Sequence, residues 1–251
     1  MAGPGRAAIK SVLVPEAHAL GMLAAIRSLG RAGYRVHAAS PRGDAIGFAS
    51  RFCAAKAVCP AYDSPRYVDW VRGYVAEQAI GAIVPGGAFL LAIEPCFEDF
   101  RHLLPIAQDR HLVYRAFSKA DIYEAFRAAP VTLGLLDHHP PSLVIDRDAP
   151  PPSRQDTASL GEVLYLKADA RHGAPGAEDL LLGPLTPSEA IAAVQPALRS
   201  YRKVLLQGGV TGRQAGVTLL MDQRGEVLAR NCFVDLHLEP TRRGTMSLRR
   251  T

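Results

Sequence analysis

Lysine is scarce in this chain of 251 residues, so the positions that it occupies stand out. Lys167 lies near the end of an apolar segment, residues 163–168, and a loop containing Gly173 and Gly176 follows. An ammonium group that ends a buried strand needs a partner, because an unpaired buried charge is costly. Backbone N–H groups of a glycine-bearing loop can serve the same anion. The pattern therefore indicates an anion site near Lys167.

A second lysine, Lys119, is expected in the first turn of a helix. Ser118 is a typical N-cap residue, and the helix pattern runs to about Arg127. The simpler alternative for each lysine is a solvent-facing position on a helix or at a strand edge. The chain has five lysines in all, and the others are Lys10, Lys56 and Lys203.

Composition narrows the class of protein. The net charge is +5, and arginine supplies most of the positive charge. The arginines are spread along the chain without interleaved aromatic residues, which argues against a nucleic-acid-binding surface. No apolar run approaches the roughly 20 residues that span a bilayer, and the first ten residues lack the apolar stretch of a secretory signal. We therefore expect a cytoplasmic protein without a membrane segment.

The four cysteines show no spacing typical of a zinc site or a disulfide framework. We expect them to be reduced and mostly structural. They are Cys53, Cys59, Cys96 and Cys232.

The first hundred residues alternate between strand and helix patterns. Predicted strands cover residues 9–14, 34–39 and 82–85, and predicted helices cover residues 20–32 and 64–79. Strands that alternate with helices favour parallel pairing, so we expect a doubly wound α/β sheet.

Two loops of this sheet should lie where ligands bind, at the carboxyl ends of the strands. The first turn, residues 15–21, lacks the G-x-G-x-x-G pattern of a dinucleotide site. Gly86-Gly87 is the second loop, and its simpler explanation is a tight strand-to-helix turn that needs permissive backbone angles.

The second half has a different pattern. A proline-rich stretch surrounds a short predicted strand at 142–145, and a helix is predicted at 187–201. Three further extended segments are expected at 204–207, 216–221 and 227–238.

In order and spacing, several segments resemble the ATP-grasp superfamily of carboxylate-amine ligases, in particular its carbamoyl-phosphate-synthase-like branch. The resemblance covers essentially the whole chain, and its strength lies in the order of the segments. They are Ile26-Arg27-Ser28-Leu29-Gly30-Arg31-Ala32-Gly33, Ser50-Arg51-Phe52, Ser118-Lys119, Leu166-Lys167, Gln207-Gly208-Gly209-Val210-Thr211-Gly212 and Glu239-Pro240-Thr241-Arg242-Arg243-Gly244.

This resemblance implies an α/β protein with two parts. Residues 1–115 would form a Rossmann-like, pre-ATP-grasp domain with a parallel sheet. Residues 116–251 would form a partial α+β ATP-grasp domain. The implied activity is ATP-dependent ligation, in which a carboxylate is phosphorylated to an acyl phosphate that an amine or another nucleophile attacks.

The resemblance also implies which residues bind the cofactor and substrate. Two lysines would neutralise the phosphate oxygens of ATP from different sides, the glycine loop would close over them, and two arginines would hold a small carboxylate substrate. The implied ATP-binding residues are Lys119, Lys167, Gly173, Gly176, Gln207, Gly208 and Val210, and the implied substrate-binding residues are Arg242 and Arg243.

The chain also departs from the family pattern. Gly208 stands where a glutamate near the adenine edge is usual, and Ser118 replaces an aspartate. Magnesium is an expected cofactor, but its carboxylate ligands would lie beyond Thr251 and are not identifiable here. We therefore expect ATP binding with weak catalysis, unless a completing partner supplies the rest of the site. A homo-oligomer is also left open.

Two alternatives stay open. One is a non-catalytic nucleotide-binding or regulatory module with a degenerate scaffold. The other concerns Asp235, His237 and Glu239, which alternate along a predicted strand and would share one face; such a set suits a transition metal, although the spacing has little specificity. No special role is expected for His138, His139 or His172.

Overall fold

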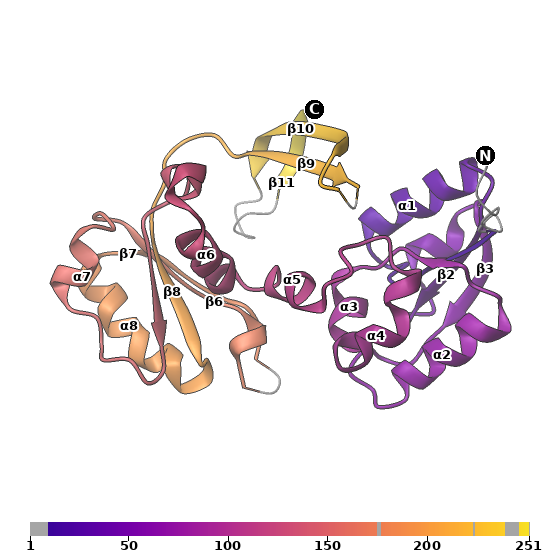
Figure 1. Ribbon diagram of the computed structural model, residues 1–251, viewed down its shortest axis with the longest axis horizontal. Coiled ribbons are helices and arrows are strands. Elements are labelled where there is room, and N and C mark those ends of the chain that lie inside the picture. Colours follow the sequence, from indigo (N-terminus) through magenta and orange to yellow (C-terminus); the bar gives the residue numbers. More distant parts are fainter. Residues whose placement is uncertain (1–9, 175–176, 223, 239–245, 251) are drawn as a thin grey trace. The chain divides into compact units, whose positions relative to one another are not determined.

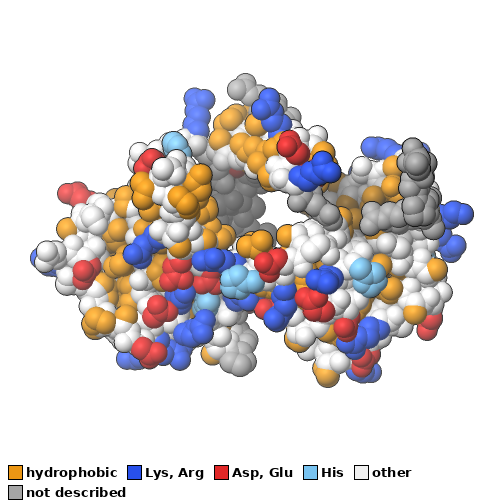
Figure 2. All heavy atoms as spheres, in the orientation of Figure 1, with side chains coloured by type: hydrophobic (Ala, Val, Ile, Leu, Met, Phe, Trp, Pro, Cys, Tyr) orange, Lys and Arg blue, Asp and Glu red, His pale blue; other side chains and the backbone are white. Residues whose placement is uncertain are grey.

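The computed structural model describes residues 10–174, 177–222, 224–238 and 246–250. The chain divides into two compact units, Met1–Tyr114 and Arg115–Thr251 (Figure 1). On the face shown in Figure 2, basic side chains are interspersed with acidic ones over both units. No helix among the described residues is long and apolar enough to cross a membrane.

Unit 1 is built on a four-stranded parallel sheet with the strand order β3-β2-β1-β4. The strands are β1 (Ser11–Val14), β2 (Arg35–Ser40), β3 (Cys53–Val58) and β4 (Ala82–Ile83). The predicted α/β class and parallel pairing are confirmed, whereas the Rossmann-like assignment stays a prediction. Strand β3 was not predicted, because its short run of small residues around Lys56 gives a weak pattern.

Helices lie on both sides of this sheet. Helix α1 (Leu20–Arg31) and helix α2 (Tyr67–Glu77) are on opposite faces (Figure 1). Ile26 of α1 is fully buried against the sheet, as apolar spacing along the helix predicts. The shorter helices that follow are α3 (Gly87–Ile93), α4 (Phe97–Phe100) and α5 (Arg110–Arg115).

The first glycine of the pair that follows β4, Gly86, is required because the Glu16 side chain lies close to it. Gly86 is the N-cap of α3, and its φ of −104° and ψ of −177° are open to any residue, so the expected need for permissive backbone angles is wrong. A Cβ atom at Gly86 would instead lie 2.3 Å from Glu16 Oε1. The Glu16 carboxylate accepts a hydrogen bond from the Phe89 N–H at 2.9 Å, so it cannot move away freely.

Gly47 and Gly73 make a matched test of packing in unit 1. An added Cβ at Gly47 would lie 2.7 Å from the Ala17 carbonyl oxygen, whereas one at Gly73, inside α2, would meet nothing within 4 Å. We expect Gly47→Ala to lower the free energy of unfolding by about 1–3 kcal/mol. Gly73→Ala should raise it by up to about 1 kcal/mol, because alanine is the better helix former. Urea unfolding of both variants checks this, and equal effects would contradict it.

Unit 2 contains a four-stranded antiparallel sheet with the order β5-β8-β6-β7. Its strands are β5 (Ser142–Asp146), β6 (Leu164–Ala168), β7 (Leu180–Leu185) and β8 (Lys203–Gly208), and its helices are α6 (Lys119–Ala128), α7 (Arg154–Ala158) and α8 (Pro187–Ser200). Edge strand β7 was not predicted, because Gly183-Pro184 interrupts its pattern; proline is tolerated at a sheet edge.

The two faces of this sheet differ in character. Leu164, Leu166 and Leu206 are fully buried and pack with Val194 of α8. Because side chains alternate along a strand, Lys167 and Gln207 point to the opposite face. Helix α6 contacts β5 and β8 and is tied to Lys203 of β8 on that second face. The alternation thus separates an apolar core from a polar face.

A three-stranded antiparallel sheet completes the described part of unit 2, in the order β11-β10-β9. Strands β9 (Ala215–Met221) and β10 (Val227–Leu238) lie where the sequence predicts extended segments, and β11 (Met246–Arg250) was not predicted. Much of β9 is exposed, including several large apolar side chains, namely Val217, Leu219, Leu220 and Met221.

Candidate phosphate-binding site

Lys167 is half-buried on the polar face of unit 2, and its hydrogen-bond partner is neutral. Its Nζ donates to Gln207 Oε1 at 2.6 Å. The Gln207 amide in turn donates from Nε2 to Ser142 Oγ at 3.0 Å, and Ser142 Oγ donates to the Pro140 carbonyl at 2.8 Å. A chain of neutral groups therefore holds the ammonium in place. Among the described residues, no carboxylate forms a salt bridge with Lys167.

Burial lowers the pKa of Lys167, and the nearby positive charge of Lys119 lowers it further. The carboxylate of Asp169 acts in the opposite direction but does not cancel these effects. Desolvation disfavours a charged lysine, and a like charge adds to that cost. An anion at this place would relieve both penalties.

Lys119 is the first residue of α6, as predicted. Ser118 caps the helix, since its side chain accepts a hydrogen bond from the Asp121 N–H at 3.2 Å. The Asp169 carboxylate accepts two hydrogen bonds from Lys119. Oδ2 accepts one from the backbone N–H at 2.8 Å, and Oδ1 accepts one from Nζ at 3.1 Å. The sequence did not indicate this partner, because 50 residues separate the two side chains along the chain.

The described part of the glycine loop is attached to the end of α8. Gly173 forms an isolated antiparallel bridge with Tyr201, and the Ala174 N–H donates to the Ser200 carbonyl at 2.8 Å. The Tyr201 hydroxyl donates to the Glu178 carbonyl. Gly176 lies outside the described residues.

A partly buried charged cluster, formed by residues of α6, β8 and the loop after β6, was missed by the sequence analysis. Lys203 Nζ pairs with Asp121 Oδ1 at 3.1 Å and with Glu124 Oε2 at 2.7 Å. His172 is buried, although no special role was expected for it. Its Nε2 lies 2.9 Å from Asp121 Oδ2, and its Nδ1 lies 3.3 Å from the Arg202 guanidinium. Since Arg202 can only donate, Nδ1 accepts and Nε2 carries the proton toward Asp121.

Burial opposes the ionisation of Asp121, but Lys203 and His172 outweigh it, so the pKa of Asp121 is lowered. For Lys203, burial opposes the charge, and Glu124 and Asp121 overcome it, so the pKa of Lys203 is raised. The Lys203 ion pairs tie α6 to β8, and the His172–Asp121 hydrogen bond ties α6 to the loop after β6. The cluster therefore fixes the elements that carry Lys119 and Lys167.

The remaining predicted residues are placed only in part. Arg242, Arg243 and Glu239 lie outside the described residues. Asp235 is buried on β10, and the side chain of His237 is not described. Among the residues that the structure describes, no group of three or more His, Cys, Asp or Glu side chains is arranged to hold a metal ion.

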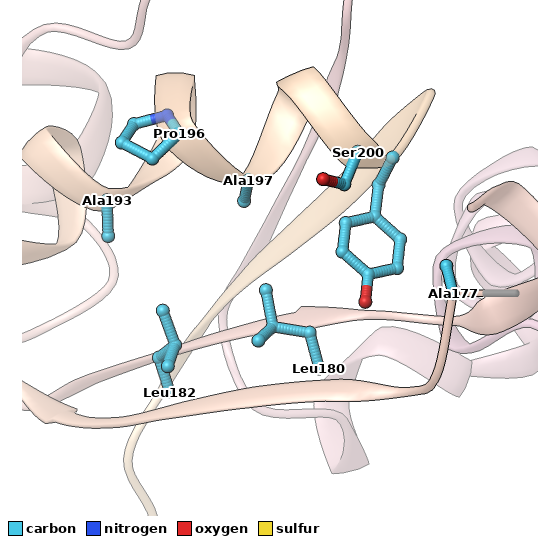
Figure 3. Close-up of a pocket in the computed structure, with 8 residues that line it drawn as sticks. Ala177, Leu180, Leu182, Ala193, Pro196, Ala197 and Ser200 are labelled. Atoms are coloured by element: carbon cyan, nitrogen blue, oxygen red, sulfur yellow. The ribbon is translucent and has the colours of Figure 1, made fainter. Parts of the chain in front are cut away.

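An apolar pocket of ≈ 630 Å³ lies on the other face of the four-stranded sheet. Ala193, Pro196 and Ala197 of α8 face Leu180 and Leu182 of β7 across it (Figure 3). Leu180 and Leu182 pair with Ala168 and Leu166, whose side chains point away from that of Lys167. This pocket is therefore separate from the lysines.

Solved structures share this architecture at low sequence identity. N5-carboxyaminoimidazole synthetase from Staphylococcus aureus superposes with a TM-score of 0.61 and 11% identity, over 94% of this chain and 56% of its own. The biotin carboxylase domain of Hydrogenobacter thermophilus 2-oxoglutarate carboxylase gives 0.61 and 16%, over 94% and 52%. L-amino acid ligase from Bacillus licheniformis gives 0.55 and 12%, over 92% and 56%. The chain has an ATP-grasp fold.

The evidence for the ATP-grasp fold is structural alone. No family model matches the sequence, and no curated protein matches it either. The chain spans little more than half the length of the ATP-grasp structures that it matches. The expected resemblance is thus confirmed at the level of the fold.

Within this ATP-grasp fold, Gly208 has a steric reason to be glycine. A Cβ atom there would lie 2.3 Å from the Leu160 carbonyl oxygen, and the Gly208 N–H already donates to the Pro141 carbonyl at 2.8 Å. Gly209 is held as well, since its N–H donates to the Val163 carbonyl at 2.7 Å. Val210 is 73% exposed. A glutamate at position 208 could not be accommodated unless the backbone moved.

The Asp121 cluster predicts how unit 2 responds to acid. Because the folded-state pKa of Asp121 is lowered, its contribution to stability is present above the ordinary aspartate pKa of about 3.9. That contribution is lost as the pH falls through the lower, folded-state pKa. Asp121→Asn should lower the free energy of unfolding by about 1–3 kcal/mol at pH 7 and flatten its acid dependence.

Urea unfolding of unit 2 between pH 7 and pH 3 measures this difference. Asp148→Asn is the control, because Asp148 is an exposed residue of the same unit. Equal pH dependence in the wild-type protein and Asp121→Asn would contradict the role given to Asp121.

Proposed function

We propose that this chain binds the phosphate groups of ATP between Lys119 and Lys167. One observation carries the proposal: Lys167 is a half-buried ammonium whose hydrogen-bond partner is the neutral Gln207 side chain, and a second lysine lies close enough to lower its pKa. Two like charges held together in a partly desolvated place favour an anion that bridges them. A polyphosphate has the charge and the several acceptor oxygens to do so.

The neighbouring groups give each lysine a defined part in this site. Gln207 and Ser142 hold Lys167 in position before a ligand arrives, so less side-chain freedom is lost on binding. Lys119 is the exposed member of the pair, with 56% of its side chain accessible, and can reach toward a phosphate from the rim. Gly173, Gly176, Gln207, Gly208 and Val210 remain proposed neighbours of the nucleotide, with Gln207 acting through Lys167.

The wider function that we propose is that of an ATP-grasp carboxylate-amine ligase, or of part of one. Residues 1–115 would be its pre-ATP-grasp domain and residues 116–251 its partial ATP-grasp domain. The fold supports this, as do the ligands of similar proteins: the Hydrogenobacter thermophilus domain was solved with MgADP and bicarbonate. An intact enzyme of this kind would transfer a phosphoryl group from ATP to a carboxylate, which in our proposal Arg242 or Arg243 holds. A nucleophile would then attack the resulting acyl phosphate, and inorganic phosphate would leave.

In such a reaction, magnesium would supply positive charge that offsets the charge of the phosphate groups. The described residues supply no carboxylate cluster that fits it. We therefore assign to this chain the steps that its own residues support: binding the phosphates, orienting them and compensating their charge.

The sharpest test is calorimetric titration of ATP into the wild-type chain and Lys167→Met. The variant removes one ammonium from the site, and charge-assisted hydrogen bonds contribute about 1.5–3 kcal/mol each, so ATP should bind about tenfold more weakly or worse. Lys56→Met is the matched control, because Lys56 is exposed on β3 of unit 1. Equal affinity in all three proteins would refute the site.

The lowered pKa of Lys167 gives a second test of the site. As the pH rises through that pKa, Lys167 loses its charge and ATP affinity should decrease. This decrease should start at a lower pH than the pKa of an ordinary lysine, about 10.4. We expect this decrease in the wild-type protein and a much smaller one in Lys167→Met. Fluorescence titration with a labelled ATP analogue can follow it, and parallel pH profiles would rule out Lys167 as the titrating group.

A non-catalytic nucleotide-binding module is the second candidate, and Gly208 favours it. The Leu160 carbonyl leaves no room for a side chain at the position where the resemblance places a glutamate. Hydroxylamine trapping of acyl phosphate, with ATP, magnesium and a panel of small carboxylates, separates the two candidates. ATP binding without any trapped product would favour the module.

A further inference from the structure

Asp169 is a buried carboxylate at the edge of the proposed phosphate site. It is 4% exposed and directly follows β6, two residues after Lys167. Both of its oxygens accept a hydrogen bond from Lys119: Oδ2 from the backbone N–H at 2.8 Å and Oδ1 from Nζ at 3.1 Å. An anion therefore already occupies the N-terminus of α6 and its first lysine.

The Asp169 side chain is held more firmly than the Lys119 side chain. The Asp169 side chain is 5% exposed, whereas the Lys119 side chain is 56% exposed. The backbone bond anchors the carboxylate independently of the ammonium, because it depends only on the start of the ten-residue helix. Lys119 can therefore swing away while Asp169 stays in place. Only the contact between Oδ1 and Nζ has to break.

We propose that Asp169 is an internal counter-anion that competes with phosphate for Lys119 and so lowers the affinity of the site for ATP. The inference rests on the proposed function, which supplies the phosphate. In the unliganded protein, the carboxylate neutralises one of two neighbouring ammonium groups. When a phosphate oxygen takes over the Lys119 Nζ, Asp169 keeps the Lys119 N–H and remains as a negative charge beside the ligand. Its repulsion weakens binding.

Asp169→Asn separates charge from shape. The asparagine carboxamide still offers its one oxygen to the Lys119 N–H, but it presents a neutral NH2 group instead of a negatively charged oxygen to the Lys119 ammonium. We expect ATP and inorganic triphosphate to bind about two- to fivefold more tightly at low salt, as for a partly exposed ion pair. The gain should shrink as the salt concentration rises, because salt screens the exposed Lys119.

Asp179→Asn is the matched control. Asp179 lies in the same loop and accepts the Ala170 N–H at 2.8 Å, so this variant removes the same charge without removing the Lys119 partner. The gain should also vanish in a Lys119→Met background, because the competition requires that ammonium. An equal gain from Asp179→Asn, or a gain that persists without Lys119, would overturn the proposal.

Calorimetry with inorganic triphosphate and with ATP keeps the two proposals distinguishable. Wild-type binding that is unchanged or weakened in Asp169→Asn would overturn the counter-anion role and leave the phosphate site standing. Binding by Asp169→Asn alone would support a counter-anion strong enough to exclude the ligand. If neither the wild-type protein nor Asp169→Asn binds triphosphate or ATP, both proposals are overturned. If Asp169→Asn does not fold, Asp169→Ser removes the same charge with a smaller acceptor and carries the same expectations.

Discussion

The cost of holding ammonium groups on a partly buried sheet face shapes the described part of unit 2. Lys119, Lys167 and Lys203 come from three elements, α6, β6 and β8. Burying a charge is unfavourable unless it is paired and hydrogen-bonded. The three lysines differ in how many carboxylates pair with them. Lys203 has two carboxylates and Lys119 has one, whereas Lys167 is bonded to a neutral carboxamide. The shortage of negative charge is therefore local, and it centres on Lys167.

The apolar face of the same sheet prevents this arrangement from relaxing. Leu164 and Leu166 are fully buried with Leu206, and a slip of β6 by one residue would turn all of its core side chains outward. The register that buries these leucines is the register that presents Lys167 on the polar face. The packing of these leucines thus keeps the Lys167 ammonium on a partly buried face, which an unconstrained lysine side chain would leave for solvent.

Local sequence patterns predicted most of the strands and the four longest helices, α1, α2, α6 and α8, but not the shorter helices. They failed where the pattern was short or interrupted: small residues weaken the signal of β3, and Gly183-Pro184 breaks that of β7. Lys167 was found because a charge near the end of an apolar strand is visible in sequence, and Lys119 because it follows a typical N-cap residue. The Lys119–Asp169 and Lys203–Asp121 pairs were not found, since the members of each pair lie 50 and 82 positions apart. Such pairings depend on the tertiary fold, which local periodicity does not encode.

Gly208 shows how a resemblance and a structure can explain one residue differently. The resemblance to ATP-grasp ligases presents it as a lost carboxylate, whereas the Leu160 carbonyl, 2.3 Å from an added Cβ, presents it as a packing requirement. Both can hold, because tight packing of β8 on the turn after α7 prevents the return of any side chain at this position. In the proposed nucleotide site, recognition would then depend on charge at Lys119 and Lys167 more than on polar contacts with the base. Charge attracts any polyphosphate, so affinity in this site should follow phosphate charge more closely than base identity.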